Sequence, residues 1–186
     1  MTKPVVCIDV DNVLADYTEG LREYVRERYG DQYPCPDPVA YDFSLTPGWP
    51  FSGSVREYLD DHRKAVCCYN LYIRLDAYEG AAENVTRLHD DGYRIIISTS
   101  RMDDGDDTRR WLLCNDIPYD GLHHGLKTDI NYRILIDDKP DVLEDCSHRA
   151  GIILHPDFQY CRNAPGLAYH TWEDVPRLIR EHEDTR

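Results

Sequence analysis

Residues 7–16 read CIDVDNVLAD, and they end an apolar run, PVVCIDV at residues 4–10, with two aspartates. The run is apolar without alternation, which is typical of a strand that is covered on both faces in a parallel sheet. A carboxylate buried at the end of such a strand costs free energy unless another group compensates its charge. Asp9 and Asp11 therefore either cap the next element or serve a cation and a reaction.

Three further β-branched runs share this pattern, at residues 93–100, 132–138 and 150–156. Helical patterns stand between and after them, at residues 80–92, 106–116 and 139–151 and from Thr171 onward. Strands that alternate with helices predict right-handed βαβ crossovers. The expected fold is therefore α/β, a three-layer arrangement with helices on both faces of a parallel sheet.

The segment between the first and second strands, residues 17–78, breaks this alternation. It holds two helical patterns, at 19–30 and 55–66, around a middle rich in proline and aromatic residues. Such a connection is far longer than the usual one in α/β folds. We expect residues 17–78 to form an inserted helical cap, and residues 1–16 with 79–186 to form the α/β core domain.

The charge balance restricts the partners that the protein can bind. The chain has 21 Lys and Arg against 35 Asp and Glu, a formal net charge of −14. This field repels polyanions, so extended nucleic acid is not an expected partner. A small anion can still bind in a pocket where a metal ion and a few local cations reverse the field.

The chain also shows no targeting or membrane signal. Its N-terminus runs almost directly into the first strand, which leaves no room for a signal peptide, and no apolar stretch approaches the length that spans a membrane. The seven cysteines are odd in number and lack C-x-x-C spacing, so we expect reduced thiols. These features favour a cytoplasmic protein.

Chemically useful residues gather where the predicted strands end. Asp9 and Asp11 follow the first strand, Thr99 ends the second, Asp137 and Asp138 end the third, and Lys127 lies in the GLKTD sequence upstream of the third. Ligands of open α/β sheets bind at the carboxyl ends of the strands. Convergent carboxylates suit Mg²⁺, while a hydroxyl group and a lysine suit phosphate oxygens. One carboxylate could attack phosphorus, and a second could move a proton.

Each of these residues also has an ordinary interpretation. An aspartate after a strand often caps a helix, a threonine is common in strands, and a lone lysine is usually on the surface. Their joint occurrence, in this order and each at a strand end or in the loop before one, is much less expected by chance. We therefore favour a catalytic site.

The motifs DVDNVLAD, STSR, GLKTD and LIDDKPD resemble the four motifs of the haloacid dehalogenase superfamily of phosphohydrolases, in order along the whole chain. The resemblance implies a Rossmann-like core with a C1-type cap. It also implies residue roles and a Mg²⁺ cofactor. Asp9 would be the nucleophile and a metal ligand, and Asp11 the general acid and base, with its main-chain carbonyl on the metal. Thr99 would bind the phosphoryl group, Lys127 would neutralise it, and Asp137 with Asp138 would complete the metal site.

Within that superfamily the chain is most similar to the 5′(3′)-deoxyribonucleotidases, which share the helical cap, the DVDxVLAD start, the TS pair and the LIDD[RK]P motif. Two positions depart from that pattern, since Asn12 replaces the usual glycine and Arg101 the usual proline. The resemblance implies a phosphomonoesterase that hydrolyses nucleoside monophosphates through an aspartyl-phosphate.

Three alternatives stay open. The stretch from STSR to GLHHG resembles the 3′-phosphatase domain of phage polynucleotide kinases, so the substrate could be a nucleic-acid end. A small-metabolite phosphatase of the same superfamily is the second. The third is a phosphoacceptor or binding module that does not turn over, although such a module needs neither Asp11 nor a sixty-residue insertion.

Several residues are candidates for reading the substrate. The aromatic residues of the insertion that could stack on a base are Tyr17, Tyr41, Phe43, Trp49, Phe51 and Tyr72, with Tyr17 and Phe43 first. Stacking of this kind contributes about 1–3 kcal/mol per base. Ser100 and Arg101 are candidates for holding substrate oxygens. The alternative without a binding role is that these aromatic residues form the hydrophobic core of the insertion. The insertion is also large enough to support a homodimer.

Overall fold

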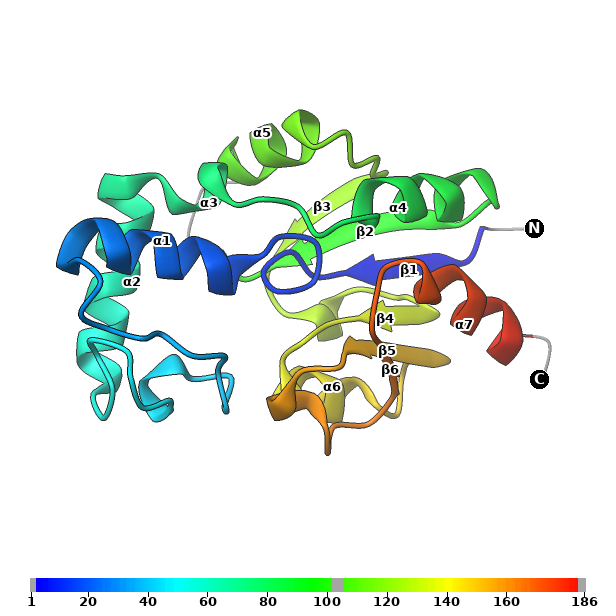
Figure 1. Cartoon of the computed structure of the whole chain (residues 1–186). Coiled ribbons are helices and arrows are strands. Elements are labelled where there is room, and N and C mark those ends of the chain that lie inside the picture. The colour runs from blue at the N-terminus through cyan, green and yellow to red at the C-terminus, as the bar shows by residue number, and fades with distance from the viewer. Residues whose placement is uncertain (1–2, 102–105, 184–186) are drawn as a thin grey trace.

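A six-stranded parallel sheet forms the centre of the protein. The computed structural model describes residues 3–101 and 106–183. The strands are β1 (Val5–Ile8), β2 (Arg94–Thr99), β3 (Gly121–His124), β4 (Ile134–Ile136), β5 (Ile152–Pro156) and β6 (Leu167–Tyr169). Their order is β3-β2-β1-β4-β5-β6, and every pair is parallel (Figure 1). The predicted α/β fold with a parallel sheet is thus confirmed.

The two edge strands, β3 and β6, escaped prediction. Both are short, and the residues of β3 are only half-buried or exposed. The four predicted strands, β2, β1, β4 and β5, are the inner strands of the sheet. Their side chains are almost all buried. A strand at the edge of a sheet lacks the continuous apolar run that marks a strand covered on both sides.

Helices cover both faces of the sheet. They are α4 (Ala81–Asp90), α5 (Asp106–Cys114), α6 (Pro140–Cys146) and α7 (Asp174–Glu183). Successive residues of β1 point to opposite faces, so Val6 and Ile8 enter the large core with α4, α5 and α7. Cys7 enters a smaller core on the other face with Leu143 of α6. The three expected layers are therefore present.

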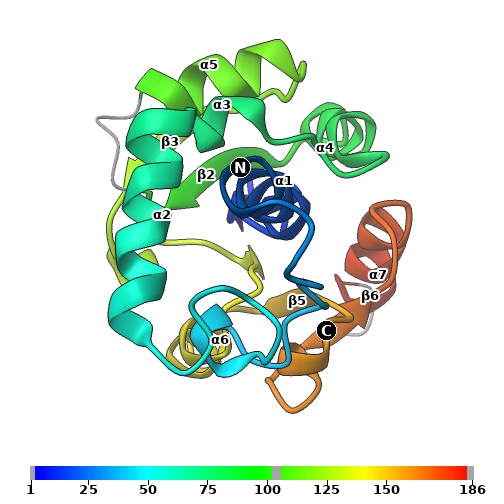
Figure 2. The ribbon, with the colours of Figure 1, turned by 60° about the vertical axis from the view of Figure 1, so that its left-hand side comes forward.

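The long connection between β1 and β2 is helical. It contains α1 (Tyr17–Tyr29), the 3₁₀ turn η1 (Phe43–Leu45), α2 (Val55–Tyr69) and α3 (Leu71–Arg74). These helices lie beyond the carboxyl end of β1 (Figures 1 and 2). The segments by which the chain enters and leaves this insertion lie side by side. They are joined by hydrogen bonds from the Tyr78 amide to Leu14 O (2.8 Å) and from the Asp16 amide to Asp76 O (2.9 Å). The insertion thus lies where the strands end.

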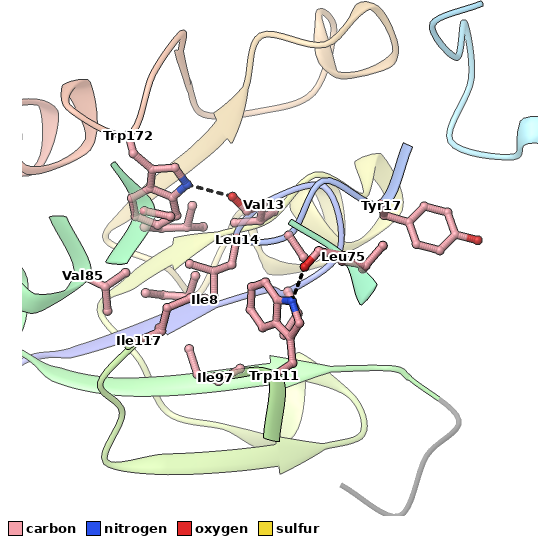
Figure 3. Packing of buried hydrophobic residues seen from close by; sticks show 14 of the residues in the cluster. Ile8, Val13, Leu14, Tyr17, Leu75, Val85, Ile97, Trp111, Ile117 and Trp172 are labelled. Atoms are coloured by element: carbon pink, nitrogen blue, oxygen red, sulfur yellow. Dashed lines mark hydrogen bonds between the residues drawn. The ribbon is translucent and has the colours of Figure 1, made fainter. Parts of the chain in front are cut away.

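Two buried tryptophans donate hydrogen bonds to loops at the carboxyl end of the sheet (Figure 3). The Trp111 indole N–H donates to Leu75 O at 2.7 Å, and that of Trp172 donates to Val13 O at 2.8 Å. Trp111 lies on α5 of the core, whereas Leu75 follows α3 of the insertion. The first hydrogen bond therefore joins the insertion to the core.

Replacing Trp111 by phenylalanine is expected to lower the free energy of unfolding by about 2 kcal/mol, since Leu75 O loses its donor and a small cavity remains. The exposed Leu113→Ala variant on the same helix is the control, with an expected change below about 0.5 kcal/mol. Urea titration of the three proteins measures both values. Equal stability of the Trp111 variant and wild type would contradict the assigned hydrogen bond.

Candidate active site

The loop after β1 curls tightly enough to turn Asp9 and Asp11 toward the same end of the sheet. Val10 O accepts hydrogen bonds from the amides of Leu14 and Ala15, both at 2.9 Å. Asn12 takes a left-handed conformation with φ of 59°. Asparagine tolerates this conformation better than most residues, which explains how it stands where the resembling enzymes have glycine.

A buried lysine joins two of the predicted carboxylates. Lys127 Nζ lies 2.6 Å from Asp9 Oδ1 and 2.8 Å from Asp137 Oδ2. Asp9 follows β1 and Asp137 follows β4, and the two strands are neighbours in the sheet. Lys127 opens the 3₁₀ turn η2 (Lys127–Asp129) before β4. Three residues from separate motifs thus form one ion-paired cluster.

Asp138 points to a different partner. Tyr160, in the 3₁₀ turn η3 (Gln159–Cys161), donates its hydroxyl to Asp138 Oδ2 at 2.7 Å. Asn12 Nδ2 in turn donates to the Tyr160 hydroxyl at 3.4 Å. Sequence reasoning did not identify Tyr160, because its contact with Asp138 depends on how the chain returns after β5.

Burial and crowding of like charges set the protonation of this cluster. Burial raises the pKa of Asp9 to about 7, with Lys127 opposing the shift and Asp137 adding to it. Burial would lower the pKa of Lys127, but the carboxylates of Asp9 and Asp137 outweigh it and raise that pKa. Burial also raises the pKa of Asp138 well above its usual range, with Asp9 and Asp137 adding to the effect. The site therefore holds more buried negative charge than its lysine balances.

Asp11 is paired with Arg101. The guanidinium Nη2 lies 2.6 Å from Asp11 Oδ1, and Nε lies 3.1 Å from both carboxylate oxygens. The Arg101 side chain is fully buried and stacks 4.3 Å from the centre of the Tyr72 ring. Its main-chain amide donates to Thr99 Oγ1 at 3.1 Å. Arg101 therefore contacts both Asp11 and Thr99.

A cavity of about 260 Å³ lies between the insertion and the core residues Asp11, Arg101 and Asp138. The residues that line it are Asp11, Asn12, Tyr17, Tyr41, Phe43, Tyr58, Leu59, His62, Tyr72, Ser100, Arg101 and Asp138. All four predicted substrate residues are among them. Their role in binding stays a prediction.

The wider set of aromatic candidates divides into two groups. Tyr41 and Tyr72 line the cavity, whereas Trp49 and Phe51 are buried against Phe43 and Tyr58. Trp49 and Phe51 thus belong to the hydrophobic core of the insertion, which is the alternative to a role in base stacking.

Three cavity residues on α2 were missed, Tyr58, Leu59 and His62, and two of them carry polar groups. The Tyr17 hydroxyl lies 2.8 Å from His62 Nδ1 and 3.4 Å from the Tyr58 hydroxyl. Burial lowers the pKa of His62. The signal that could have found Tyr58 and His62 is their spacing of four residues, which places them on one face of the predicted helix at 55–66.

The acidic residues fit a divalent cation by charge, although they are not gathered around one point. Within residues 3–101 and 106–183, no three Asp, Glu, His or Cys side chains are arranged to hold a metal ion. Asp9 and Asp137 instead face Lys127, and Asp138 faces Tyr160. Mg²⁺ sites commonly use only one or two carboxylates, with waters and phosphate oxygens supplying the rest. The buried carboxylates of Asp9 and Asp137 at Lys127, with that of Asp138 at Tyr160, are compatible with such a site.

The arrangement suits chemistry on an anionic group. Asp9 offers a carboxylate at the end of a strand, Lys127 offers a positive charge beside it, and Asp11 offers a second carboxylate at the cavity. Thr99 is buried, and its hydroxyl accepts a hydrogen bond from the main-chain amide of Arg101, the partner of Asp11. A nucleophile, a cation and a separate proton carrier are the parts that phosphoryl transfer through a carboxylate requires.

The sequence matches known proteins along almost its whole length. Residues 3–183 match the model of the family described as 5′ nucleotidase, deoxy (pyrimidine), cytosolic type C protein (NT5C). A protein of Chlorobaculum tepidum that carries the name "Putative 5′(3′)-deoxyribonucleotidase" is 26% identical over 185 residues. The alignment covers 95% of this chain and 90% of that protein.

Solved structures share the fold. A predicted phosphatase from Clostridium acetobutylicum superposes with a TM-score of 0.66 at 15% identity, over 97% of this chain and 100% of that one. A haloacid dehalogenase-like hydrolase from Streptococcus pneumoniae superposes with a TM-score of 0.63 at 16% identity, over 95% and 98% of the two chains. In the described part of the chain, every helix is too short or too polar to span a bilayer.

Proposed function

Because this chain belongs to the NT5C family of haloacid dehalogenase-type 5′ nucleotidases, we propose that it is a Mg²⁺-dependent phosphomonoesterase that hydrolyses nucleoside monophosphates through an aspartyl-phosphate. The observation that carries the proposal is the buried Asp9–Lys127–Asp137 cluster beside a cavity of nucleotide-like size. We place this activity in the cytoplasm, as the family description suggests.

Asp9 would attack the phosphorus atom, and the ester bond to the sugar oxygen would break. Asp11 would give its proton to that oxygen, so the nucleoside leaves as an alcohol. In the second step Asp11 would take a proton from water, whose oxygen attacks phosphorus and releases Asp9 and inorganic phosphate. Lys127 would balance the phosphate charge next to Asp9, and Thr99 would donate its hydroxyl to a phosphate oxygen.

Asp9, Asp137, Asp138 and the main-chain carbonyl of Asp11 would hold the Mg²⁺ ion. When bound, the ion supplies positive charge that offsets both the buried carboxylates and the phosphate. The excess of buried negative charge around Lys127 supports this assignment.

The insertion would select the substrate. Its aromatic side chains Tyr17 and Phe43 cover the cavity and would stack on a base, while Ser100 and Arg101 lie on its core side. The cavity of about 260 Å³ favours a mononucleotide over a nucleic-acid end. The net charge of −14 points the same way, because it repels a polyanion.

Phosphate release from a substrate panel tests the proposal. The panel holds nucleoside 5′- and 3′-monophosphates, sugar phosphates and a 3′-phosphorylated oligonucleotide, each with Mg²⁺ and with excess EDTA. We expect release from mononucleotides only, and its loss in EDTA. Release from the oligonucleotide alone would support the end-repair alternative instead. No release from any substrate by folded protein would leave a phosphoacceptor or binding role.

A further inference from the structure

The proposed reaction assigns no step to the ion pair between Arg101 and Asp11. Arg101 follows β2 and Asp11 follows β1, and these strands are neighbours in the sheet, so the two side chains meet beyond the carboxyl ends of the strands. A proline, which the resembling enzymes have at the position of Arg101, carries no group that could make this pair. The four motifs of the sequence therefore do not account for it.

The guanidinium group holds the Asp11 carboxylate through several contacts. Nη2 lies 2.6 Å from Oδ1, and Nε lies 3.1 Å from both Oδ1 and Oδ2. A planar guanidinium that makes more than one such contact fixes the plane of a carboxylate as well as its position. In the described part of the chain, Oδ1 has two of these contacts and Oδ2 has one. Oδ2 is therefore the oxygen that can exchange a proton more easily.

The guanidinium group is itself held by neighbouring side chains. It lies 4.3 Å from the ring centre of Tyr72 in α3 and 5.7 Å from that of Trp111 in α5, and Nη1 lies 3.5 Å from Thr108 Oγ1. A cation next to aromatic rings is bound more strongly when it is shielded from water. Contacts from both the insertion and the core thus fix the guanidinium in one place.

The two members of the pair differ in exposure. Both residues line the cavity of the proposed active site, but the Arg101 side chain is 0% exposed, whereas that of Asp11 is 26% exposed. A molecule in the cavity can therefore contact the Asp11 carboxylate, while the guanidinium group is covered. An effect of the Arg101 side chain on the reaction would then have to pass through Asp11.

We propose that Arg101 is a positioning residue, which holds the Asp11 carboxylate in the orientation that both proton transfers require. In the proposed function, on which this role rests, Asp11 gives a proton to the sugar oxygen as the bond to phosphorus breaks, and later takes one from water. General acid and base catalysis of this kind contributes about 10²–10⁴-fold to a rate. A variant that keeps Asp11 but lets its carboxylate turn should therefore lose about 10²-fold.

Steady-state kinetics with a nucleoside monophosphate give the first test. Arg101→Met should lower kcat about 10²-fold and change KM by less than about threefold, because the interaction that is lost serves the chemical step. Arg110→Met, which replaces an exposed arginine of α5, is the matched control and should keep the kcat and KM of wild type. A rise in KM with unchanged kcat would overturn the proposal and indicate that Arg101 holds the substrate directly.

A change of leaving group gives the second test. With enzyme in excess over substrate, release of the alcohol or phenol reports only the step that breaks its bond to phosphorus. p-Nitrophenolate leaves without a proton, so Arg101→Met should release it from p-nitrophenyl phosphate at close to the wild-type rate. Release of the nucleoside from its monophosphate should be about 10²-fold slower than in wild type. An equal loss with both substrates would overturn the proposal, because it would indicate a general defect.

A double variant keeps the test valid if Arg101→Met alone is unstable. Asp11→Asn with Arg101→Met removes both charges of the pair, so neither is left without its partner, and thermal melting checks the fold of each protein. If Arg101 acts only through Asp11, adding Arg101→Met to Asp11→Asn should lower kcat by less than about threefold, since the two effects are then not additive. A further loss near 10²-fold would overturn the proposal. Inactivity of wild type on every phosphomonoester would instead refute the proposed function.

Discussion

The Asp9→Asn variant is expected to lose about 10⁴-fold or more of kcat for a nucleoside monophosphate, the range found when an enzyme loses its nucleophile. Asparagine keeps the shape of the side chain and an oxygen near Lys127, but its amide cannot form the acyl phosphate. Because the variant also removes a buried negative charge, its fold should be as stable as that of wild type or more so. Activity and stability are therefore expected to change independently.

Two measurements separate this loss from a general defect. When turnover of a substrate labelled in its phosphate is quenched with acid, the wild-type protein should carry covalent phosphate. The Asp9→Asn variant should carry none. Asp141→Asn, an exposed carboxylate on α6, is the matched control and should retain full activity. An Asp9→Asn enzyme that keeps more than a small fraction of wild-type kcat would show that Asp9 is not the nucleophile.

The sequence predicted the centre of the fold because burial leaves a pattern that is local in the chain. Strands β1, β2, β4 and β5 are covered on both faces and read as continuous apolar runs. Strand β3, GLHH, shows no such run, since its place at the edge depends on pairing with Ile96–Thr99 of β2. That pairing joins segments more than twenty residues apart, which no local pattern records.

The candidate site shows the same division. Asp9, Asp137 and Lys127 meet because parallel strands end at one edge of a sheet, so motif order and strand position were sufficient to predict their proximity. The contact between Tyr160 and Asp138 and the burial of Trp49 within the insertion depend on side-chain packing between distant segments. Residue type alone does not separate a buried aromatic from one that lines a cavity.

The pairing of Arg101 with Asp11 is the least expected feature of the site. The sequence makes Arg101 a candidate for holding substrate oxygens, and that role stays a prediction. Its side chain is fully buried, between the Tyr72 ring and the Asp11 carboxylate. Since a carboxylate that accepts a forked guanidinium is held in one orientation, Arg101 constrains Asp11 as well as facing the cavity.

Replacing Lys127 by methionine is expected to abolish activity and also to lower the free energy of unfolding by about 3 kcal/mol or more at pH 8 without added metal, the range measured when one partner of a buried ion pair is removed. Asp9 and Asp137 would stay buried without their cation. The Lys64→Met control removes an exposed lysine 3.5 Å from Asp61, and it should cost less than about 1 kcal/mol. Chemical denaturation of the three proteins gives the comparison.

The pH dependence of this effect follows from the shifted pKa of Asp9. In the folded protein that pKa lies near 7, above the ordinary aspartate value of 3.8, so at a pH between these two values the folded state binds more protons than the unfolded state. Stability therefore falls as the pH rises through this interval. Since Lys127 holds the pKa of Asp9 down, its removal should raise that pKa further and increase the cost of the ionised form. The deficit of Lys127→Met should thus be smaller at pH 5 than at pH 8, and an equal or larger deficit at pH 5 would mean that lost packing, not unpaired charge, destabilises the variant.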